Sequence, residues 1–244
     1  HRGSSQAAAN GRKRVYNNGP TLACTDNRQR GVHNAGLLNR RRAGDRADSN
    51  AGRPGAAMTD AGARPAGVHP DAALGEAGEG EPTIGADPTI RRGTIVYADV
   101  TIGDRFTTGH GAVVREATSI GDDVLVGTHA VVDGSCRLGD GVSLQTGVYL
   151  PTGTVVGDRA FFGPHAVLTN DPYPLREDCG LSAPTVEDDA SIGANATVMP
   201  GVTVGERAFV AANAVVTEDV PPETLAVGAP ASHEPLPERS EERR

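Results

Sequence analysis

A large apolar residue recurs at every sixth position from Ile84 onward, and this period limits what the chain can fold into. The frame holds without a break over 84 residues and returns from Val186 to Val216. Of the first fourteen residues at the first place of this repeat, thirteen are large and apolar, and Thr108 is the exception. The apolar residues are Ile84, Ile90, Val96, Ile102, Val114, Ile120, Val126, Val132, Leu138, Leu144, Leu150, Val156 and Phe162. The fifth place is small or β-branched almost throughout, as at Ala112 and Val124.

A repeat of this kind cannot bury its apolar side alone. Copies stacked at the strand spacing of about 4.8 Å would bury a continuous column of aliphatic side chains. The period therefore predicts an all-β fold, a parallel β-helix built as a solenoid. We expect the glycine at the second place, as in Ile120-Gly121-Asp122, to permit the turns of the coil. An antiparallel sandwich or barrel would need period-two strands and turns every 8 to 12 residues or so, which the six-residue frame does not supply.

One segment, residues 169–185, interrupts the repeat. It contains Asn170-Asp171-Pro172-Tyr173-Pro174 followed by acidic residues. Proline cannot donate to a strand ladder, so we expect this segment to leave the coil as an external loop. Loops on a rigid scaffold often carry function, although a tolerated insertion is the alternative.

Charge and composition divide the chain into four parts. Residues 1–57 carry eleven basic and three acidic groups without periodicity, which predicts a disordered basic segment. The first methionine is Met58, so we expect the preceding stretch to lie outside the native protein; a nucleic-acid-binding arm is the alternative. We predict a low-complexity lead-in over 58–82, the β-helix over 83–231 and a charged tail over 232–244.

The periodic part predicts a protein that binds neither nucleic acid nor membrane. Residues 58–244 carry 12 arginines, no lysine and 28 acidic groups, a balance that repels a polyanion. No apolar run approaches the roughly 20 residues that cross a bilayer, so we expect a cytoplasmic location. The three cysteines are far apart in the sequence, which favours neither a disulfide framework nor a thiolate zinc site.

Two stretches resemble a known family beyond the repeat itself. The run Phe162-Gly163-Pro164-His165-Ala166-Val167-Leu168-Thr169-Asn170-Asp171-Pro172-Tyr173-Pro174 and the ending through Gly228-Ala229-Pro230-Ala231 are similar to the hexapeptide-repeat acyltransferases. The closest subgroup N-acetylates amino sugars on nucleotide carriers. Gln145-Thr146-Gly147 departs from that subgroup, which usually has Q-N-N or Q-S-N there, and this leaves the acceptor open.

The resemblance implies a left-handed β-helix, a homotrimer with active sites between neighbouring prisms, and acetyl-coenzyme A as co-substrate with no metal. Its pantetheine arm would lie along the coils, near the small side chains of Ala194, Ala211 and Ala212. The implied reaction is acetylation of an amino or hydroxyl group on a small sugar or sugar-nucleotide acceptor.

Histidine is the natural general base for acyl transfer because its pKa lies near neutrality. His129 and His165 share the fourth place of the hexad and are 36 residues apart, so three hexads per coil would stack them two coils apart with Gly147 as an open notch between them. His110 stacks on Thr128, next to His129. We predict His165 as the base because it directly precedes the loop; a solvated histidine stripe is the alternative.

Other polar residues are candidates for positioning the acceptor. Asn170 and Asp171 would act in catalysis by binding the acceptor or orienting the histidine, although turn formation explains them equally well. For substrate contacts we predict His110, His129 and Gln145 on the coils, with Tyr173 and Arg176 on the loop.

Two other classes stay open. The γ-class carbonic anhydrases use the same prism with three histidines on zinc, and His129 with His165 resembles two of them. Gly134 and Asn170 stand where that family's further histidine would lie. A non-catalytic structural β-helix is the remaining reading.

Overall fold

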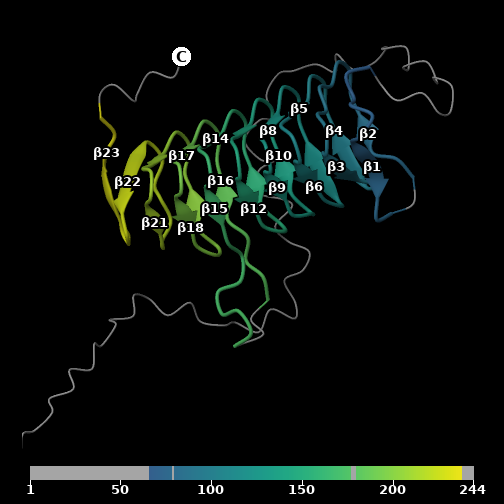
Figure 1. The fold of residues 1–244 in the computed structure, drawn as a ribbon. Coiled ribbons are helices and arrows are strands. Elements are labelled where there is room, and N and C mark those ends of the chain that lie inside the picture. The colour runs from purple at the N-terminus through teal and green to yellow at the C-terminus, as the bar shows by residue number, and fades with distance from the viewer. Residues whose placement is uncertain (1–65, 79, 177–179, 238–244) are drawn as a thin grey trace, which may run out of the picture. The chain divides into compact units, whose positions relative to one another are not determined.

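The computed structural model describes residues 66–78, 80–176 and 180–237, all within one compact unit of the chain, Arg42–Arg244. The predictions for residues 1–57 lie outside the described residues. The described part is a parallel β-solenoid whose short strands form successive rungs, as Figure 1 shows. The predicted all-β helix is therefore confirmed.

The strands form three sheets, one for each side of the coil. The first sheet contains β1 (Ala73–Glu76), β3 (Ile95–Tyr97), β6 (Val113–Val114), β9 (Val131–Val132), β12 (Tyr149–Leu150), β15 (Val167–Leu168), β18 (Thr197–Val198) and β21 (Val215–Val216). The second contains β2 (Thr83–Ile84), β4 (Val100–Ile102), β7 (Thr118–Ile120), β10 (Arg137–Leu138), β13 (Val155–Val156), β16 (Thr185–Val186) and β19 (Thr203–Val204). The third contains β5 (Thr107–Thr108), β8 (Leu125–Val126), β11 (Ser143–Leu144), β14 (Phe161–Phe162), β17 (Ser191–Ile192), β20 (Phe209–Val210), β22 (Thr224–Gly228) and β23 (Ala231–Pro235).

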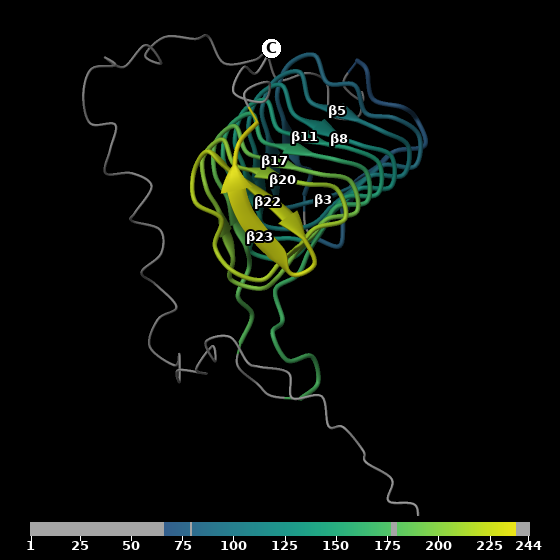
Figure 2. The same cartoon turned by 90° about the vertical axis from the view of Figure 1, so that its left-hand side faces the viewer.

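Up to β22, consecutive strands of the chain lie in different sheets, and each pairs in parallel with the strand one full coil away. Leu144 thus lies between Val126 and Phe162 of the neighbouring coils. The view along the solenoid in Figure 2 shows the stacked coils, with β22 and β23 at the C-terminal end. Three hexads therefore make one coil, as the sequence predicts.

The core consists of the first and fifth places of the repeat. Leu144, Leu150, Phe162 and their neighbours in the column have no exposed surface, and the small fifth-place residues such as Ala160 are buried beside them. Each full burial of a large aliphatic side chain contributes roughly 1.5–3 kcal/mol. Stacking the coils is thus the main source of stability.

The polar exception in the repeat, Thr108, points inward and is satisfied by hydrogen bonds. Its hydroxyl lies 2.9 Å from the hydroxyl of Thr94 and accepts the backbone N–H of Arg91 at 2.9 Å. The Thr94 hydroxyl also donates to the Gly109 carbonyl at 3.2 Å. Because buried hydroxyls are costly only when unpaired, the core accepts this pair.

The second-place glycines have a different role from the expected one. Gly121 has no left-handed φ, so the turn itself does not require glycine there. Instead, a Cβ at Gly121 would lie 2.9 Å from the amide nitrogen of Asp140 and closer still to its carboxylate. The carboxylate of Asp140 accepts the N–H of Asp122 at 2.8 Å, and glycine leaves room for it.

The turn is made at the fourth place of the hexad. Most residues there adopt left-handed φ values, for example Arg105 at 57°, Asp123 at 58° and His165 at 59°. Non-glycine residues are uncommon in this region, so the corners are maintained by the stacking of the coils on either side.

The bounds predicted for the β-helix, residues 83 and 231, need correction at both ends. β1 lies inside the segment expected to be a lead-in and pairs in parallel with β3, so coiling begins before residue 83. The expected charged tail begins as β23, which pairs antiparallel with β22. Neither strand carries the six-residue signal, because β1 is only partly buried and β23 is mostly exposed.

Residues 169–184 leave the coil between β15 and β16, and Figure 1 shows this loop extending away from the sheets. The expected external loop is thus present, apart from residues 177–179, which are not described. None of the described residues forms a long apolar helix of the kind that crosses a bilayer.

Candidate functional site

Three rows of turns run along the solenoid, and they differ in chemistry. The histidine corner joins the third sheet to the first and comprises residues 91–94, 109–112, 127–130, 145–148, 163–166, 193–196 and 211–214. The aspartate corner joins the second sheet to the third and comprises residues 85–88, 103–106, 121–124, 139–142, 157–160, 187–190 and 205–208. The loop corner joins the first sheet to the second and includes the loop 169–184.

Most of the predicted site residues lie together on the histidine corner. The set consists of His110, His129, Gln145, His165, Ala194, Ala211 and Ala212. The coil-to-coil hydrogen bonds from Gly147 N to Thr128 O and from His165 N to Thr146 O fix the stacking of His129 and His165 two coils apart. That separation is roughly 10 Å along the axis. The predicted stacking is therefore correct.

The histidine corner contains no carboxylate. Every turn of the aspartate corner, in contrast, carries at least one aspartate or glutamate. On the histidine corner the basic residues are Arg91, Arg92 and the three histidines. Residues 58–244 carry a large excess of acidic groups. Among the three corners, the histidine corner is therefore the one best suited to an anionic ligand.

The imidazole rings of His129 and His165 pack over glycines of the preceding coil. A Cβ at Gly147 would lie 2.6 Å from Cε1 of His165, and a Cβ at Gly111 would lie 2.7 Å from Cε1 of His129. The notch expected at Gly147 is therefore filled by the ring of His165. Both histidines remain exposed, so each ring is positioned by the backbone below it and open to solvent above it.

Free backbone N–H groups form a row on the same corner. At the aspartate corner, third-place amides such as that of Asp122 donate to a carboxylate of the next coil. The corresponding amides on the histidine corner have no acceptor among the described residues; they belong to Arg92, His110, Thr128, Thr146, Ala194 and Ala212. The row is interrupted at Pro164, which has no N–H. Such a row can bind carbonyl or phosphate oxygens of a ligand lying along the axis.

Gln145 does not extend freely from the corner. Its side-chain amide donates to the hydroxyl of Ser143 at 2.9 Å. Ser143 lies on the outer side of β11, so this bond directs the amide toward the third sheet. A role for Gln145 in acceptor binding stays a prediction.

The loop residues are not brought to the histidine corner of their own chain. His165 precedes β15 and Asn170 follows it, so the two lie at opposite ends of that strand. The amide of Asn170 donates to the Thr152 carbonyl at 3.0 Å, and the carboxylate of Asp171 accepts the N–H of Tyr173 at 2.9 Å. Both contacts shape the loop.

Tyr173 and Arg176 belong to this same loop turn. The backbone N–H of Arg176 donates to the Tyr173 carbonyl at 2.9 Å. Tyr173 is partly exposed and Arg176 is exposed, so both side chains are accessible to a ligand at the loop corner. Contact with an acceptor is untested.

A polar cluster near the loop corner escapes sequence reasoning. Asp133 accepts a hydrogen bond from the Tyr149 hydroxyl at 2.9 Å and pairs with Arg115 at 2.6 Å. The guanidinium of Arg115 also lies over the Tyr97 ring, 5.5 Å from its centroid. Partial burial and the Asp133 carboxylate raise the pKa of Tyr149 to about 12, so its phenol is neutral at physiological pH.

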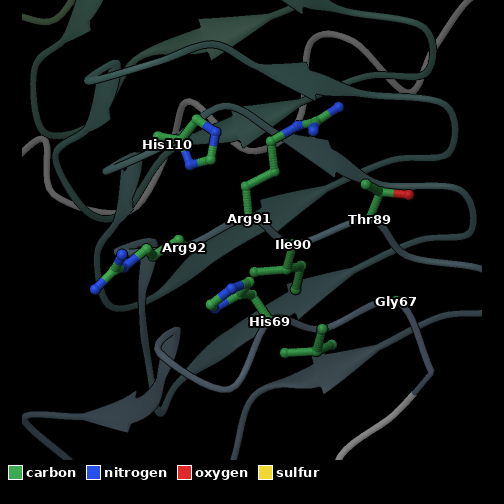
Figure 3. Close-up of a pocket in the computed structure, with 8 residues that line it drawn as sticks. Gly67, His69, Thr89, Ile90, Arg91, Arg92 and His110 are labelled. Carbon is green, nitrogen blue, oxygen red and sulfur yellow. The ribbon is translucent and has the colours of Figure 1, made fainter.

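A pocket at the N-terminal end of the histidine corner was also not predicted. It is an open cavity of about 310 Å³ lined by Gly67, Val68, His69, Thr89, Ile90, Arg91, Arg92 and His110. Figure 3 shows its basic side chains around Ile90. The sequence gives no signal for it, because His69 precedes the regular repeat and joins the corner only through the irregular first coil.

The arrangement of possible metal ligands bears on the anhydrase alternative. Within residues 66–78, 80–176 and 180–237, no three histidine, cysteine or acidic side chains lie close enough together to hold a metal ion.

Comparison with known proteins agrees with the repeat and the fold. A model of bacterial transferase hexapeptide repeats matches residues 183–218, and a model of the hexapeptide repeat of succinyl-transferase matches residues 117–151. No curated protein matches significantly.

Solved structures give further likenesses. The UDP-N-acetylglucosamine acyltransferase from Campylobacter jejuni is 19% identical over 68% of this chain and 73% of its own, with a TM-score of 0.51. The hexapeptide-repeat acetyltransferase VCA0836 from Vibrio cholerae is 30% identical over 52% of this chain and 70% of its own, with a TM-score of 0.39. PerB from Caulobacter crescentus, solved with CoA and GDP-perosamine, is 26% identical over 68% of this chain and 56% of its own, with a TM-score of 0.34.

The fold and the repeat define the class of the protein, a parallel β-helix built from hexapeptide repeats. The two matching models show hexapeptide repeats of the kind found in bacterial transferases over residues 117–151 and 183–218.

Proposed function

We propose that the protein is an acetyl-coenzyme A-dependent acyltransferase that acetylates an amino or hydroxyl group of a sugar-like acceptor. The observation that carries the proposal is the chemistry of the histidine corner. It combines exposed histidines, a row of free backbone N–H groups and an absence of carboxylates in an otherwise acidic surface. The matches to transferase hexapeptide-repeat models support the same reaction class.

His165 is the proposed general base. Its imidazole is exposed and fixed over Gly147, so it can accept the proton that the acceptor loses while its nitrogen or oxygen attacks the thioester carbonyl. The bond from carbonyl carbon to sulfur then breaks, and the proton passes from the imidazole to the departing thiol. Free amides on the corner, such as that of Thr146, suit the oxyanion that forms between these steps.

Coenzyme A fits the C-terminal half of the histidine corner. The methyl side chains of Ala194, Ala211 and Ala212 leave the backbone accessible there. The free N–H groups of Ala194 and Ala212 would donate to carbonyl groups of a pantetheine arm running along the axis.

A homotrimer is part of the proposal. The outward side chains of the first sheet are mostly aliphatic and partly exposed: Ile95, Val113, Val131, Tyr149, Val167, Thr197 and Val215. The second sheet presents mainly threonine, serine and arginine in the same positions. Because the first sheet borders the histidine corner, a neighbouring subunit on this face would also form the second wall of the active site. Sedimentation equilibrium tests the trimer.

The test of function is thiol release from acetyl-CoA with amino-sugar nucleotides, simple sugars and serine as acceptors. His165→Ala should lower kcat by about 10²- to 10⁴-fold, the range expected for a general base. His233→Ala is the matched control, because His233 is exposed on β23, beyond the last turn of the histidine corner and several coils from His165.

Two results would redirect the assignment. Stoichiometric zinc in the purified protein together with hydration of CO₂ would favour the γ-class carbonic anhydrase. Absence of coenzyme A binding in calorimetry would leave a structural β-helix. Cytoplasmic location stays a prediction that fractionation can check.

A further inference from the structure

The four phenylalanines of the chain divide equally between the core and one outward face. Phe106 and Phe162 have no exposed surface, whereas Phe161 is 36% exposed and Phe209 is 38% exposed. Phe161 lies on β14 and Phe209 on β20, and both point outward from the third sheet. Apolar side chains gathered on one face mark an interaction site, whereas single ones do not. These two rings therefore single out the outward face of the third sheet.

The outward residues of the third sheet form a column along the solenoid axis. Figure 2 shows the strands of this sheet stacked in order. Their parallel pairing sets the order of the column, which contains Leu125, Ser143, Phe161, Ser191, Phe209 and Leu225. Neighbouring members are one coil apart, about 4.8 Å. Large apolar residues thus alternate with serines, until Leu225 follows Phe209 at the C-terminal end.

This column is complementary to itself when its direction is reversed. Consider the same face of a second copy packed against it with the solenoid axes antiparallel and a two-fold axis between Phe161 and Ser191. Phe161 of each copy then faces Ser191 of the other copy. The remaining contacts follow in the same register: Phe209 with Ser143, and Leu125 with Leu225. Each ring fills the space above a serine, which is the self-complementary fit that a two-fold contact requires.

The charged residues beside the middle of the column fit the same register. Arg159 and Asp189 lie there on the aspartate corner and form an ion pair at 2.6 Å. The two-fold axis would place Arg159 opposite Asp189 of the second copy, so that two guanidinium groups and two carboxylates alternate around the axis. Asp123 and Glu223 would meet further from the axis, and each is already paired with an arginine of its own chain. The charges at the centre of the contact are therefore complementary.

The face is level and large enough for such a contact. Gly163 and Gly193 border the two central strands on the side of the histidine corner, so no side chain there holds a partner away. The sheet has eight strands. At a spacing of about 4.8 Å, with about four residues across each strand, the face measures roughly 500 Å². Two copies together would bury roughly 1,000 Å², the lower bound for a specific interface. We expect a weak association that depends on concentration.

We propose that the outward face of the third sheet is a self-association surface whose partner is the same face of a second copy, packed antiparallel. The first sheet, which the proposed trimer uses, lies on another side of the solenoid. Both contacts can therefore form in one assembly. The proposal does not depend on the acyl transfer.

Sedimentation equilibrium of the full chain over a range of concentrations tests the contact. The weight-average mass of the wild type should rise with concentration. Phe161→Ser removes the ring above Ser191 and should weaken association about tenfold or more, and Phe209→Ser should act in the same way. Leu181→Ser is the matched control, because Leu181 is 64% exposed on the loop, and it should associate as the wild type does. A wild type whose mass never exceeds that of Phe161→Ser would leave the face to a different partner and overturn the proposal.

Ser191→Phe separates the proposed register from general apolar association. It adds apolar surface, but it sets two rings against each other across the contact and should weaken association about tenfold. The double variant Phe161→Ser/Ser191→Phe exchanges ring and serine, restores the fit and should associate as the wild type does. Tighter association of Ser191→Phe than of the wild type would overturn the proposal. A double variant that associates no better than either single variant would do so as well.

Discussion

Substituting alanine for Gly147 tests whether the backbone beneath His165 positions a catalytic ring. Gly147 has φ +70°, and a Cβ there would lie 2.6 Å from Cε1 of the imidazole. Two costs follow. A left-handed backbone costs an alanine roughly 1–2 kcal/mol. The ring must also move away, because no side chain is tolerated at that distance.

The chain offers two matched controls with nearly the same backbone. Gly141 has φ +66°, but a Cβ there would meet Arg159 without severe overlap, at 3.3 Å from Cγ and 3.8 Å from Cα. Gly111 has φ +64° and lies beneath the ring of His129. The three alanine variants should therefore lose a similar backbone contribution of about 1–2 kcal/mol, and they differ in which side chain moves.

The assays are urea unfolding and thiol release from acetyl-CoA. A displacement of about 1 Å in a catalytic group can cost around 10²-fold in rate. Gly147→Ala should therefore lower kcat by about that factor, whereas Gly141→Ala should keep most of its activity. A large loss in Gly111→Ala alone would identify His129 as the base instead. Equal kcat for all three variants would refute the idea that these glycines position a catalytic ring.

Three further predictions concern the scaffold. Leu144→Ala should lower the free energy of unfolding by about 2–5 kcal/mol because Leu144 is fully buried. Leu125→Ala should lower it far less, because Leu125 on β8 is partly exposed. Urea titration of both variants checks this. Asp140→Ala removes the acceptor of the Asp122 N–H and should cost about 0.5–1.5 kcal/mol, and no loss in the same titration would argue against a stabilising role for the aspartate ladder. Absorbance of the phenolate should show one tyrosine that titrates near pH 12, and this titration should be missing in Tyr149→Phe. Because folding raises the pKa of Tyr149, the stability that its phenol contributes is present below about pH 10 and is lost as the pH rises toward 12.

The repeat determined the fold because the period of the apolar residues and the period of the coil are the same. Val126, Leu144 and Phe162 are spaced by three hexads, and only stacked coils bury all of them together. The same spacing placed His129 and His165 on one outward corner. The loop after β15 was equally predictable, since its prolines cannot join a ladder.

Tertiary structure decided what the repeat leaves unspecified. The role of Gly121 depends on a carboxylate one coil away, and the position of the His165 ring depends on Gly147 beneath it. Asn170 and Asp171 follow His165 closely in sequence, but β15 separates them from it in space.

The chemistry of the histidine corner depends on residues that are distant in sequence. Arg91, His129 and Ala212 show no common pattern until the coils are stacked. Local periodicity reports which side of a strand is buried, so it fixes the path of the backbone. It carries no information on which outward residues of different coils become neighbours with unpaired donors, because those contacts arise only when the coils pack.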